Sequence, residues 1–374
     1  MTKLNRKHIL TTALLLGAAS VGTQILLIRQ FLTIFYGNEL IIGFLLAVWL
    51  LCVGLGSAVG NRWWKKRSPA IQFIAPVFIS SLFFAFIAAI ISRFARLILA
   101  MPLGEQIPLA KLFLLGFLLL ACPCFLFGML FSLLAALRQM PHSNDVPAAQ
   151  IYIYEAAGTS LLGIVFSFLA PHFSNLLLLY ALLIVSAWLL FFCFRQKWLL
   201  IFAAAATMLL GPYHYSRLES KVMHGYWDSF RAGFQVIQWE NTRFGEIALL
   251  NVQGDDYLYK NGAKITLLND ELTNQPLAAL LMTAHPRPHG ILLIEGALGG
   301  LPFELMRFDS LQITALEMDA AAFRFVQSHY PRSNINPSNQ SSVDFIHQDA
   351  RFFLHHCDDN FDLIVINAGD PATA

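Results

Sequence analysis

Hydrophobic residues dominate the first 213 positions of the chain and become sparser after them. Apolar runs close to the ~20 residues that a bilayer-crossing helix needs recur through this half. The pattern predicts about seven membrane spans, of which the last is the shortest: 9–28, 40–60, 70–91, 112–137, 151–171, 175–194 and 198–213. Small residues at Gly54-Leu-Gly-Ser57 and Gly158-Thr-Ser-Leu-Leu-Gly163 predict faces where helices pack closely.

Basic residues between the predicted spans indicate an orientation. They gather in every second loop: Arg62, Lys65, Lys66 and Arg67, then Arg138, then Arg195 and Lys197. Because positive loops stay in the cytoplasm, we expect a multi-pass protein of the plasma membrane with a cytoplasmic N-terminus. Seven crossings from that start would leave the rest of the chain outside, where nucleotide cofactors are scarce. The sequence leaves three options open: 198–213 does not cross, another span is split, or the C-terminal part is external.

After residue 213, polar residues recur regularly between the apolar ones. Residues 214–272 are predicted to form a linker and a small β-domain, with strands at 234–239, 245–251, 256–260 and 263–268 and a hairpin turn at Asn261-Gly262. Residues 273–374 alternate helices with short apolar strands at 291–294, 313–316, 343–347 and 362–366. The predicted fold is thus a multi-span α-helical membrane domain (1–213), a small β-domain (214–272) and a Rossmann-like α/β domain (273–374). Since such sheets commonly have six strands, the last domain is expected to be truncated.

The rest of the chain is organised around one βαβ stretch, Ile291–Asp319. Its first strand runs into Glu295-Gly-Ala-Leu-Gly-Gly300, and its second strand ends on Glu317. Glycines at such a turn let the backbone approach a ligand, and an acid about 20 residues on accepts hydrogen bonds from ribose hydroxyls. The stretch indicates nucleotide-type binding, although similar turns also occur in α/β domains that bind nothing.

Composition excludes several other classes. Hydrophobic residues make up 57% of the chain and charged residues 13%, and the latter is about half the share in soluble domains. The net charge of +2 gives no reason to expect nucleic acid. The five cysteines have no disulfide or zinc-type spacing, and no metal is expected, even at the histidine-rich stretch His347, His355, His356 and Cys357.

The order of motifs in the second half resembles the spermidine synthases, or polyamine aminopropyltransferases, and in particular their relatives fused to a multi-span N-terminus. The matching segments, in order, are Asp270-Glu271, His285-Pro286, the glycine loop, Glu317, Gln348-Asp349-Ala350 and the closing Asn367-Ala-Gly-Asp370-Pro371. Gln24-Ile-Leu-Leu-Ile-Arg29 and Gly37-Asn38-Glu39-Leu40 also look like the membrane-fused group.

The resemblance implies a transferase-type Rossmann domain that binds decarboxylated S-adenosylmethionine or methylthioadenosine and passes an aminopropyl group to a polyamine. Glu317 would hold the ribose hydroxyls, and Asp349 with Ala350 would hold the adenine amino group. The loop under the sulfonium nucleoside would consist of Glu295, Gly296, Leu298, Gly299 and Gly300.

The residues that depart from the family pattern are those to which the resemblance assigns catalysis and substrate binding. Asn367 stands where the resemblance implies the catalytic acid, and an amide cannot take a proton from the attacking amine. Leu298 replaces the acid of the glycine loop, Asn274-Gln275 replaces a Tyr-His pair, and Ile265 replaces a glutamine. Asp370 is a candidate compensating base.

Three functions therefore stay open: a membrane-bound aminopropyltransferase-like enzyme, a transporter or sensor with a non-catalytic nucleoside-binding domain, and another S-adenosylmethionine-dependent transferase. The expected partners are the lipid bilayer, a small nucleoside and a polyamine, and a homo-oligomer is left open.

Overall fold

Two compact units make up the chain, Met1–Phe230 and Arg231–Ala374. The computed structural model describes residues 6–34, 39–66, 71–103, 105, 107–137, 147–209, 212–230, 233–330 and 341–367. The boundary between the units falls inside the predicted linker, so the helix that follows residue 211 belongs to the first unit.

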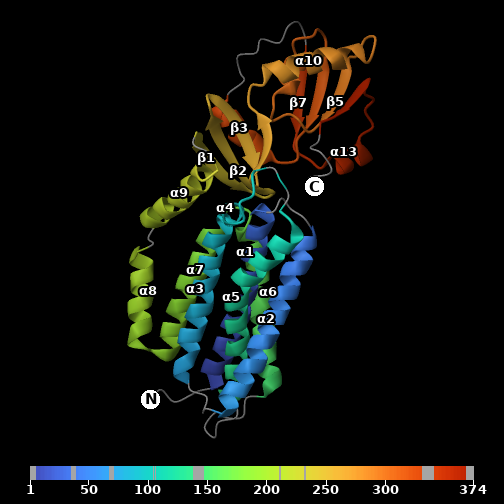
Figure 1. Ribbon diagram of the computed structural model, residues 1–374. Coiled ribbons are helices and arrows are strands. Elements are labelled where there is room, and N and C mark those ends of the chain that lie inside the picture. The colour runs from blue at the N-terminus through green and yellow to red at the C-terminus, as the bar shows by residue number, and fades with distance from the viewer. Residues whose placement is uncertain are drawn as a thin grey trace. The chain divides into compact units, whose positions relative to one another are not determined.

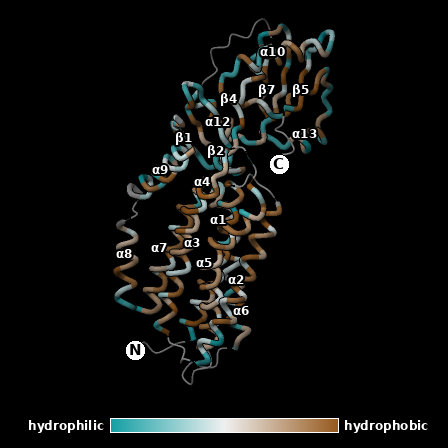
Figure 2. Tube along the Cα trace, in the orientation of Figure 1, coloured by the Kyte–Doolittle hydropathy of each residue, from teal (hydrophilic) through white to brown (hydrophobic). Residues whose placement is uncertain are grey.

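The first unit is helical and runs as a bundle of long helices (Figure 1). Its elements are α1 (Arg6–Ile34), α2 (Glu39–Lys66), the short η1 (Ile71–Phe73), α3 (Ile74–Arg93), α4 (Ala95–Ile98), α5 (Leu109–Leu137), α6 (Ala148–Leu169), α7 (Asn175–Phe194), α8 (Lys197–Leu209) and α9 (Pro212–Asp228). Figure 2 shows that hydrophobic residues prevail along α1 to α8, whereas α9 and the second unit carry many more hydrophilic ones.

Within the described part of the chain, six helices are long and apolar enough to cross a membrane. They are α1, α2, α3 with η1, α5, α6 and α7, which correspond to the first six predicted spans. The seventh prediction falls on α8, which has 13 residues. At 1.5 Å per residue this helix is about 20 Å long, short of the ~30 Å of a hydrocarbon core.

Glycines bring two helix pairs into backbone contact. A Cβ atom on Gly158 of α6 would collide with the carbonyl oxygen of Leu14 in α1, and one on Gly56 of α2 would collide with that of Phe125 in α5. Gly54 and Gly163, in the same predicted small-residue faces, have nothing within 4 Å of a built Cβ. Close packing is therefore confirmed at one glycine of each face and is wrong for the other.

The ends of the bundle can be told apart by contacts within this unit. At one end Arg6 Nη2 donates to Gln150 Oε1 over 2.8 Å, and the ring of His8 lies 6.0 Å from that of Phe194. These contacts join the starts of α1 and α6 to the end of α7. At the other end Asn175 Nδ2 donates to Gln30 Oε1 over 3.0 Å, which joins the start of α7 to the last turns of α1.

Helix α9 lies at this second end. Ser174 and Tyr215 share a hydrogen bond of 2.7 Å between their hydroxyls, and Arg93 Nη1 donates to the sulfur of Met223 over 3.0 Å. Ser174 caps the start of α7, and Arg93 ends α3. Helix α8 runs back along α7 towards that end, with the Trp188 indole donating to Thr207 over 3.2 Å. The chain thus leaves the helical unit at the end opposite its N-terminus.

The second unit begins with an antiparallel sheet of β1 (Phe234–Thr242), β2 (Gly245–Val252), β3 (Asp255–Lys260) and β4 (Ala263–Leu267), in that order. These are the four strands that the alternating pattern predicts. Asn261 and Gly262 have φ of 53° and 82°, which is the left-handed backbone of a tight two-residue hairpin.

A parallel sheet follows, with the order β7-β6-β5-β8. Its strands are β5 (Gly290–Ile294), β6 (Gln312–Leu316), β7 (Ser342–Ile346) and β8 (Leu363–Ile366), and its helices are α10 (Glu271–Thr283), α11 (Leu301–Leu305), α12 (Ala320–His329) and α13 (Ala350–His356). Strand β5 is central and buried, since Ile291, Leu292 and Leu293 are 0% exposed. Helix α11 is short, because the chain gives way to turns before Ser310, whose φ is 60°.

Candidate functional site

The carboxyl ends of all four parallel strands meet at one edge of the sheet, where ligands of open α/β sheets bind. Three predicted site residues are hydrogen-bonded there to the neighbouring strand. The Glu295 amide donates to Leu316 O over 2.9 Å, the Glu317 amide to Ile346 O over 3.0 Å, and the Asn367 amide to Ile294 O over 2.9 Å. Across the edge the order is therefore Glu317, Glu295, Asn367.

The glycine loop crosses this edge in a conformation that requires its glycines. Gly296 and Gly300 have φ of 87° and 101°, a region that side chains rarely adopt. A Cβ on Gly296 would also collide with the side-chain amide of Asn367, so these two residues are in contact. A Cβ on Gly299 would lie 2.7 Å from Thr266 Oγ1 in β4. The loop therefore packs against both sheets of the unit.

Leu298 points away from the strand edge. It is 8% exposed and belongs to an apolar cluster that includes Leu249 of β2 and Phe323 of α12. The structure does not bring its side chain together with the carboxylates at the edge, and only its backbone follows the loop. The resemblance implied this position as part of the loop under the nucleoside, and a match in sequence does not reveal which side of the loop a side chain faces.

Glu317 is the most buried acid of the edge. Its side chain is 3% exposed, and its Oε2 has no hydrogen-bond partner among the residues that the structure describes. Burial raises the pKa of Glu317 to about 8, the nearby Glu295 carboxyl adds to the shift, and the Lys260 ammonium opposes it. Burial likewise raises the pKa of Glu295, although less. The two carboxyl groups lie close enough to share a hydrogen bond.

Glu295 follows β5 with a φ of 62°, an unusual value for a residue with a side chain. Such backbone is costly and tends to persist at functional sites. The conformation turns the chain from the strand into the glycine loop and leaves the Glu295 side chain half-buried beside Glu317.

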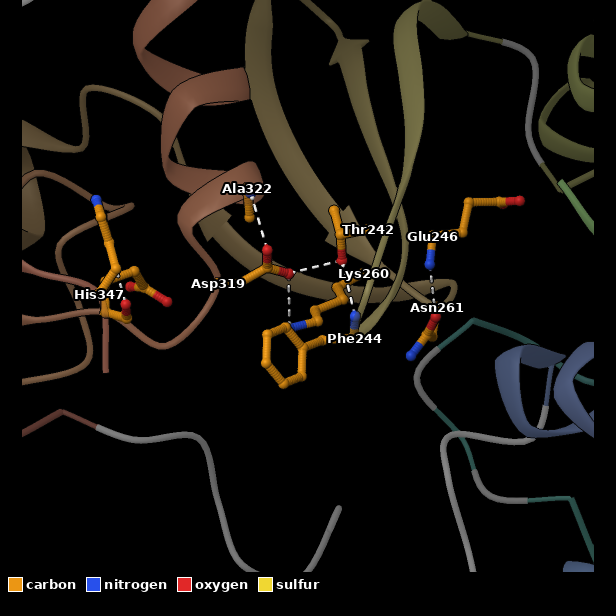
Figure 3. Close-up of polar contacts among 9 residues, drawn as sticks. Thr242, Phe244, Glu246, Lys260, Asn261, Asp319, Ala322 and His347 are labelled. Atoms are coloured by element: carbon orange, nitrogen blue, oxygen red, sulfur yellow. Dashed lines mark hydrogen bonds and ion pairs between the residues drawn. The ribbon is translucent and has the colours of Figure 1, made fainter. Parts of the chain in front are cut away.

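A polar network that the sequence did not predict ties the two sheets together (Figure 3). Asp319, 3% exposed, accepts from Thr242 Oγ1 over 2.7 Å and from the Ala322 amide over 3.1 Å, and thereby caps α12. Lys260 Nζ lies 3.4 Å from Asp319 Oδ2 and 5.4 Å from the Phe244 ring centroid. The position of Asp319 just before a helix was a capping signal, but nothing in the sequence pairs it with β1 and β3.

Asp349 is the N-cap of α13 and is exposed. Its Oδ1 accepts from the amides of Arg351 over 2.8 Å and of Phe352 over 3.1 Å. Ala350 packs with the apolar residues Leu292 and Leu316 beneath the edge. Asp349 thus stands at the β7 end of the strand edge, and Asp370 lies outside the described residues.

A separate pocket of about 220 Å³ opens on the other flank of the glycine loop. It is lined by Asn269, Asp270, Glu271, Asn274, Gly299, Gly300, Phe303, Glu304 and Arg307. The Asn274 side-chain amide donates to Gly299 O over 2.9 Å, and Arg307 Nε lies 2.9 Å from Glu304 Oε2. The segment that follows Asp270-Glu271 is thereby joined to the glycine loop.

Comparison with known proteins finds a family match in the C-terminal part of the chain. Residues 272–374 match the spermine/spermidine synthase domain. A polyamine aminopropyltransferase of Ruegeria sp. is 24% identical over 157 residues, which cover 40% of this chain and 50% of the relative. One of Streptococcus uberis is 28% identical over 143 residues, covering 38% and 47%. The chain spans about half the length of the curated relatives it matches.

Solved structures include two spermidine synthases with local similarity. The enzyme from Thermotoga maritima is 20% identical with a TM-score of 0.32, covering 36% of this chain and 48% of its own. A spermidine synthase in complex with the transition state analogue AdoDATO is 19% identical with a TM-score of 0.32, covering 37% and 47%. The C-terminal part of the chain carries a spermine/spermidine synthase domain.

Proposed function

We propose that this is a membrane-bound, spermidine synthase-like protein whose second unit binds an adenosine thioether or sulfonium at the carboxyl edge of its parallel sheet. The observation that carries the proposal is Glu317. It ends the strand beside the glycine loop, it is almost fully buried, and its Oε2 has no partner in the described part of the chain. A buried carboxylate oxygen without a donor is costly, and ribose hydroxyls would supply the donors.

The rest of the edge supports the same ligand. Gly296 has no side chain, so a nucleoside can lie against its backbone next to Asn367. Asp349 would meet the adenine at the β7 end, on the far side of Glu317 from the loop. No acidic group other than those already named is needed for binding a nucleoside.

Aminopropyl transfer is the activity that the resemblance implies. An amine nitrogen would attack the aminopropyl carbon next to the sulfonium, the carbon–sulfur bond would break with its electrons going to sulfur, and the amine would lose one proton. Methylthioadenosine would be the thioether product. Asn367 can accept a hydrogen bond from the ammonium but cannot take its proton, so we expect this transfer to be slow.

A second candidate is a membrane sensor or transporter in which the nucleoside-binding unit does no chemistry. The burial of Leu298 in an apolar cluster favours it, because no carboxylate stands at that position to meet a cationic substrate. Both candidates share the nucleoside site and differ only in whether bound ligand is consumed.

Calorimetry tests the shared site on the full chain in detergent micelles, with methylthioadenosine and decarboxylated S-adenosylmethionine as ligands. At a pH above 8, where Glu317 is ionised, Glu317→Gln should weaken binding by about 1.5–3 kcal/mol, the contribution of hydrogen bonds to a charged group. Glu240→Gln, the same change at an exposed position of β1, should leave affinity unchanged. Absence of saturable heat from the wild-type protein with both ligands would contradict the proposal.

A further inference from the structure

Glu295 follows the central strand of the parallel sheet in a backbone conformation that favours glycine. Its φ is 62°, and that of Gly296, the next residue, is 87°. Glycine would adopt either value without strain, so a glutamate at position 295 adds strain that the turn itself does not require. Its side chain is half-buried at the strand edge that also holds Glu317. Strain together with partial burial of an acid indicates that the Glu295 carboxyl has a role at this edge.

The surroundings of the Glu295 carboxyl differ on its two sides. In the described part of the chain, the charged groups that act on it are Lys260, at the end of β3, and Asp319 and Glu317, which follow β6. On the other side β8 is followed by Asn367, a neutral amide. The two glutamates lie within hydrogen-bonding reach, so a proton on either carboxyl can be shared between them. The Glu295 side chain is therefore turned towards Glu317.

This contact uses the carboxyl group that a ribose would need. A carboxylate has two oxygens, and the neighbouring hydroxyls of a ribose can donate to both. Glu317 Oε2 is buried without a partner among the described residues, whereas the proton shared with Glu295 engages the same carboxyl group. Burial raises the pKa of Glu317, and the neighbouring Glu295 carboxyl raises it further. From β7, His347 Nδ1 lies 3.2 Å from the main-chain oxygen of Glu317.

We infer that Glu295 is a positioning residue that holds Glu317 in a protonated, ligand-free form, and that a nucleoside must break the contact between the two carboxyl groups to bind. The inference rests on the proposed nucleoside site. On binding, the hydrogen bond between the carboxyls is lost, the Glu317 proton leaves to solvent, and the ribose hydroxyls donate to the resulting carboxylate. Glu295 therefore opposes binding where Glu317 is protonated in the free protein, and it has little effect once Glu317 is ionised.

Calorimetry with methylthioadenosine on the full chain in detergent, near pH 6.5 and near pH 9, tests this competition. Glu295→Gln keeps the shape of the side chain and removes its charge. We expect it to bind at least about threefold more tightly than the wild type near pH 6.5, and within about twofold of the wild type near pH 9. Glu295→Gly removes the side chain and suits the positive φ, so it should show the same pattern even if the glutamine variant folds poorly.

A double variant shows whether Glu295 acts through Glu317. In a Glu317→Gln background, Glu295→Gln should leave affinity unchanged, because the group on which it acts no longer titrates. Glu240→Gln, at an exposed position of β1, is the matched control and should follow the wild type at both pH values.

The outcomes separate the inference from the site. A merely structural Glu295 would change affinity by the same factor at both pH values. That result, or a folded Glu295→Gln protein that binds no more tightly than the wild type near pH 6.5, would overturn the inference while the nucleoside site stands. An undiminished effect of Glu295→Gln in the Glu317→Gln background would do the same. Absence of binding by the wild type and all variants at both pH values would overturn the site and the inference together.

Discussion

Asn367 has the most direct consequence for catalysis among the single residues of the site. It follows β8, and its side chain touches Gly296 of the loop beneath the proposed nucleoside. We expect Asn367→Asp to raise aminopropyl transfer from decarboxylated S-adenosylmethionine to putrescine by at least about tenfold, since a positioned general base typically contributes 10²–10⁴-fold. Product formation measured on the full chain would show it.

The control for this change is Asn360→Asp. Asn360 is exposed and precedes β8, whereas Asn367 follows it. It should not affect transfer. A wild-type protein as fast as Asn367→Asp would show that the base lies elsewhere. Leu298 is not a useful second position for an added acid, because Leu298→Asp would bury an unpaired charge in the cluster around Phe323.

The ionisation of Glu317 predicts a pH dependence of ligand affinity. Its pKa is raised to about 8, so at pH 6 it is mostly protonated, and the carboxylate that accepts the ribose hydrogen bonds is scarce. Binding the ionised form releases a proton, and affinity for methylthioadenosine should therefore rise with pH and level off above about 8. We expect at least a tenfold gain between pH 6 and 8, from the ~1.4 kcal/mol that each pKa unit represents.

Glu317→Gln serves as the reference for that titration, since its weaker affinity should be nearly flat over the same range. Other charged groups near Glu317 are Glu295, Lys260, Asp319 and His347, whose Nδ1 lies 3.2 Å from Glu317 O. A wild-type affinity that falls as pH rises, or a Glu317→Gln protein with the wild-type slope, would contradict the assignment.

Residues differed in how well the sequence revealed them. The places of Glu317 and the glycines at the strand edge could be predicted because they follow from local order: a strand, a turn, a helix and a strand. Lys260 and Thr242 could not, because each meets Asp319 across more than fifty residues of chain and only the folded pairing of two sheets brings them together. The apolar burial of the Leu298 side chain could not be predicted either, because a turn residue can face either side of a loop.

Elements followed their hydrophobic patterns closely. Strands β5 and β6 were predicted from short branched runs, which suit strands buried on both faces. The helices α1, α2, α3, α5, α6 and α7 were predicted from long apolar runs. Helix α8 was predicted from the same apolar signal, yet it ends too early for a full span. Its place depends on the contacts with α7, which hydropathy alone does not contain.

Packing of α1 against α6 gives a prediction at this scale. Gly158 lies against the Leu14 carbonyl, so even a methyl group would force the helices apart. Gly158→Ala should lower the stability of the helical unit by about 1–3 kcal/mol, as overpacking does. Heating the protein in detergent and following the loss of its monodisperse peak in size-exclusion chromatography would measure it.

Gly163 provides the control in the same helix, because a Cβ there meets nothing within 4 Å. Gly163→Ala should be neutral or stabilise the helix by up to about 1 kcal/mol through its better helix propensity. Equal losses for the two variants would show that the contact between α1 and α6 does not decide stability.

At the scale of the whole molecule, the charges at the two ends of the helical bundle predict which side of a membrane each end faces. Basic residues gather at the end of the bundle that holds the N-terminus, including Lys65 and Lys66 at the end of α2 and Lys197 at the start of α8. Helix α9 lies at the opposite end, against Ser174 and Arg93. If the bundle spans a membrane, α8 runs back towards that opposite end although it is shorter than a full span. It can do so because it packs on α7 instead of standing alone in lipid.

We therefore predict that the N-terminus is cytoplasmic and that the chain leaves the helical unit on the other side. Reporter fusions after Lys66 should report the cytoplasm, and fusions after His172 and after Phe230 should both report the outside. A cytoplasmic report after Phe230 together with one after Lys66 would mean that α8 turns back within the bilayer. An external second unit would have no access to the cytoplasmic pool of sulfonium nucleosides, and that location would favour the sensor over the transferase.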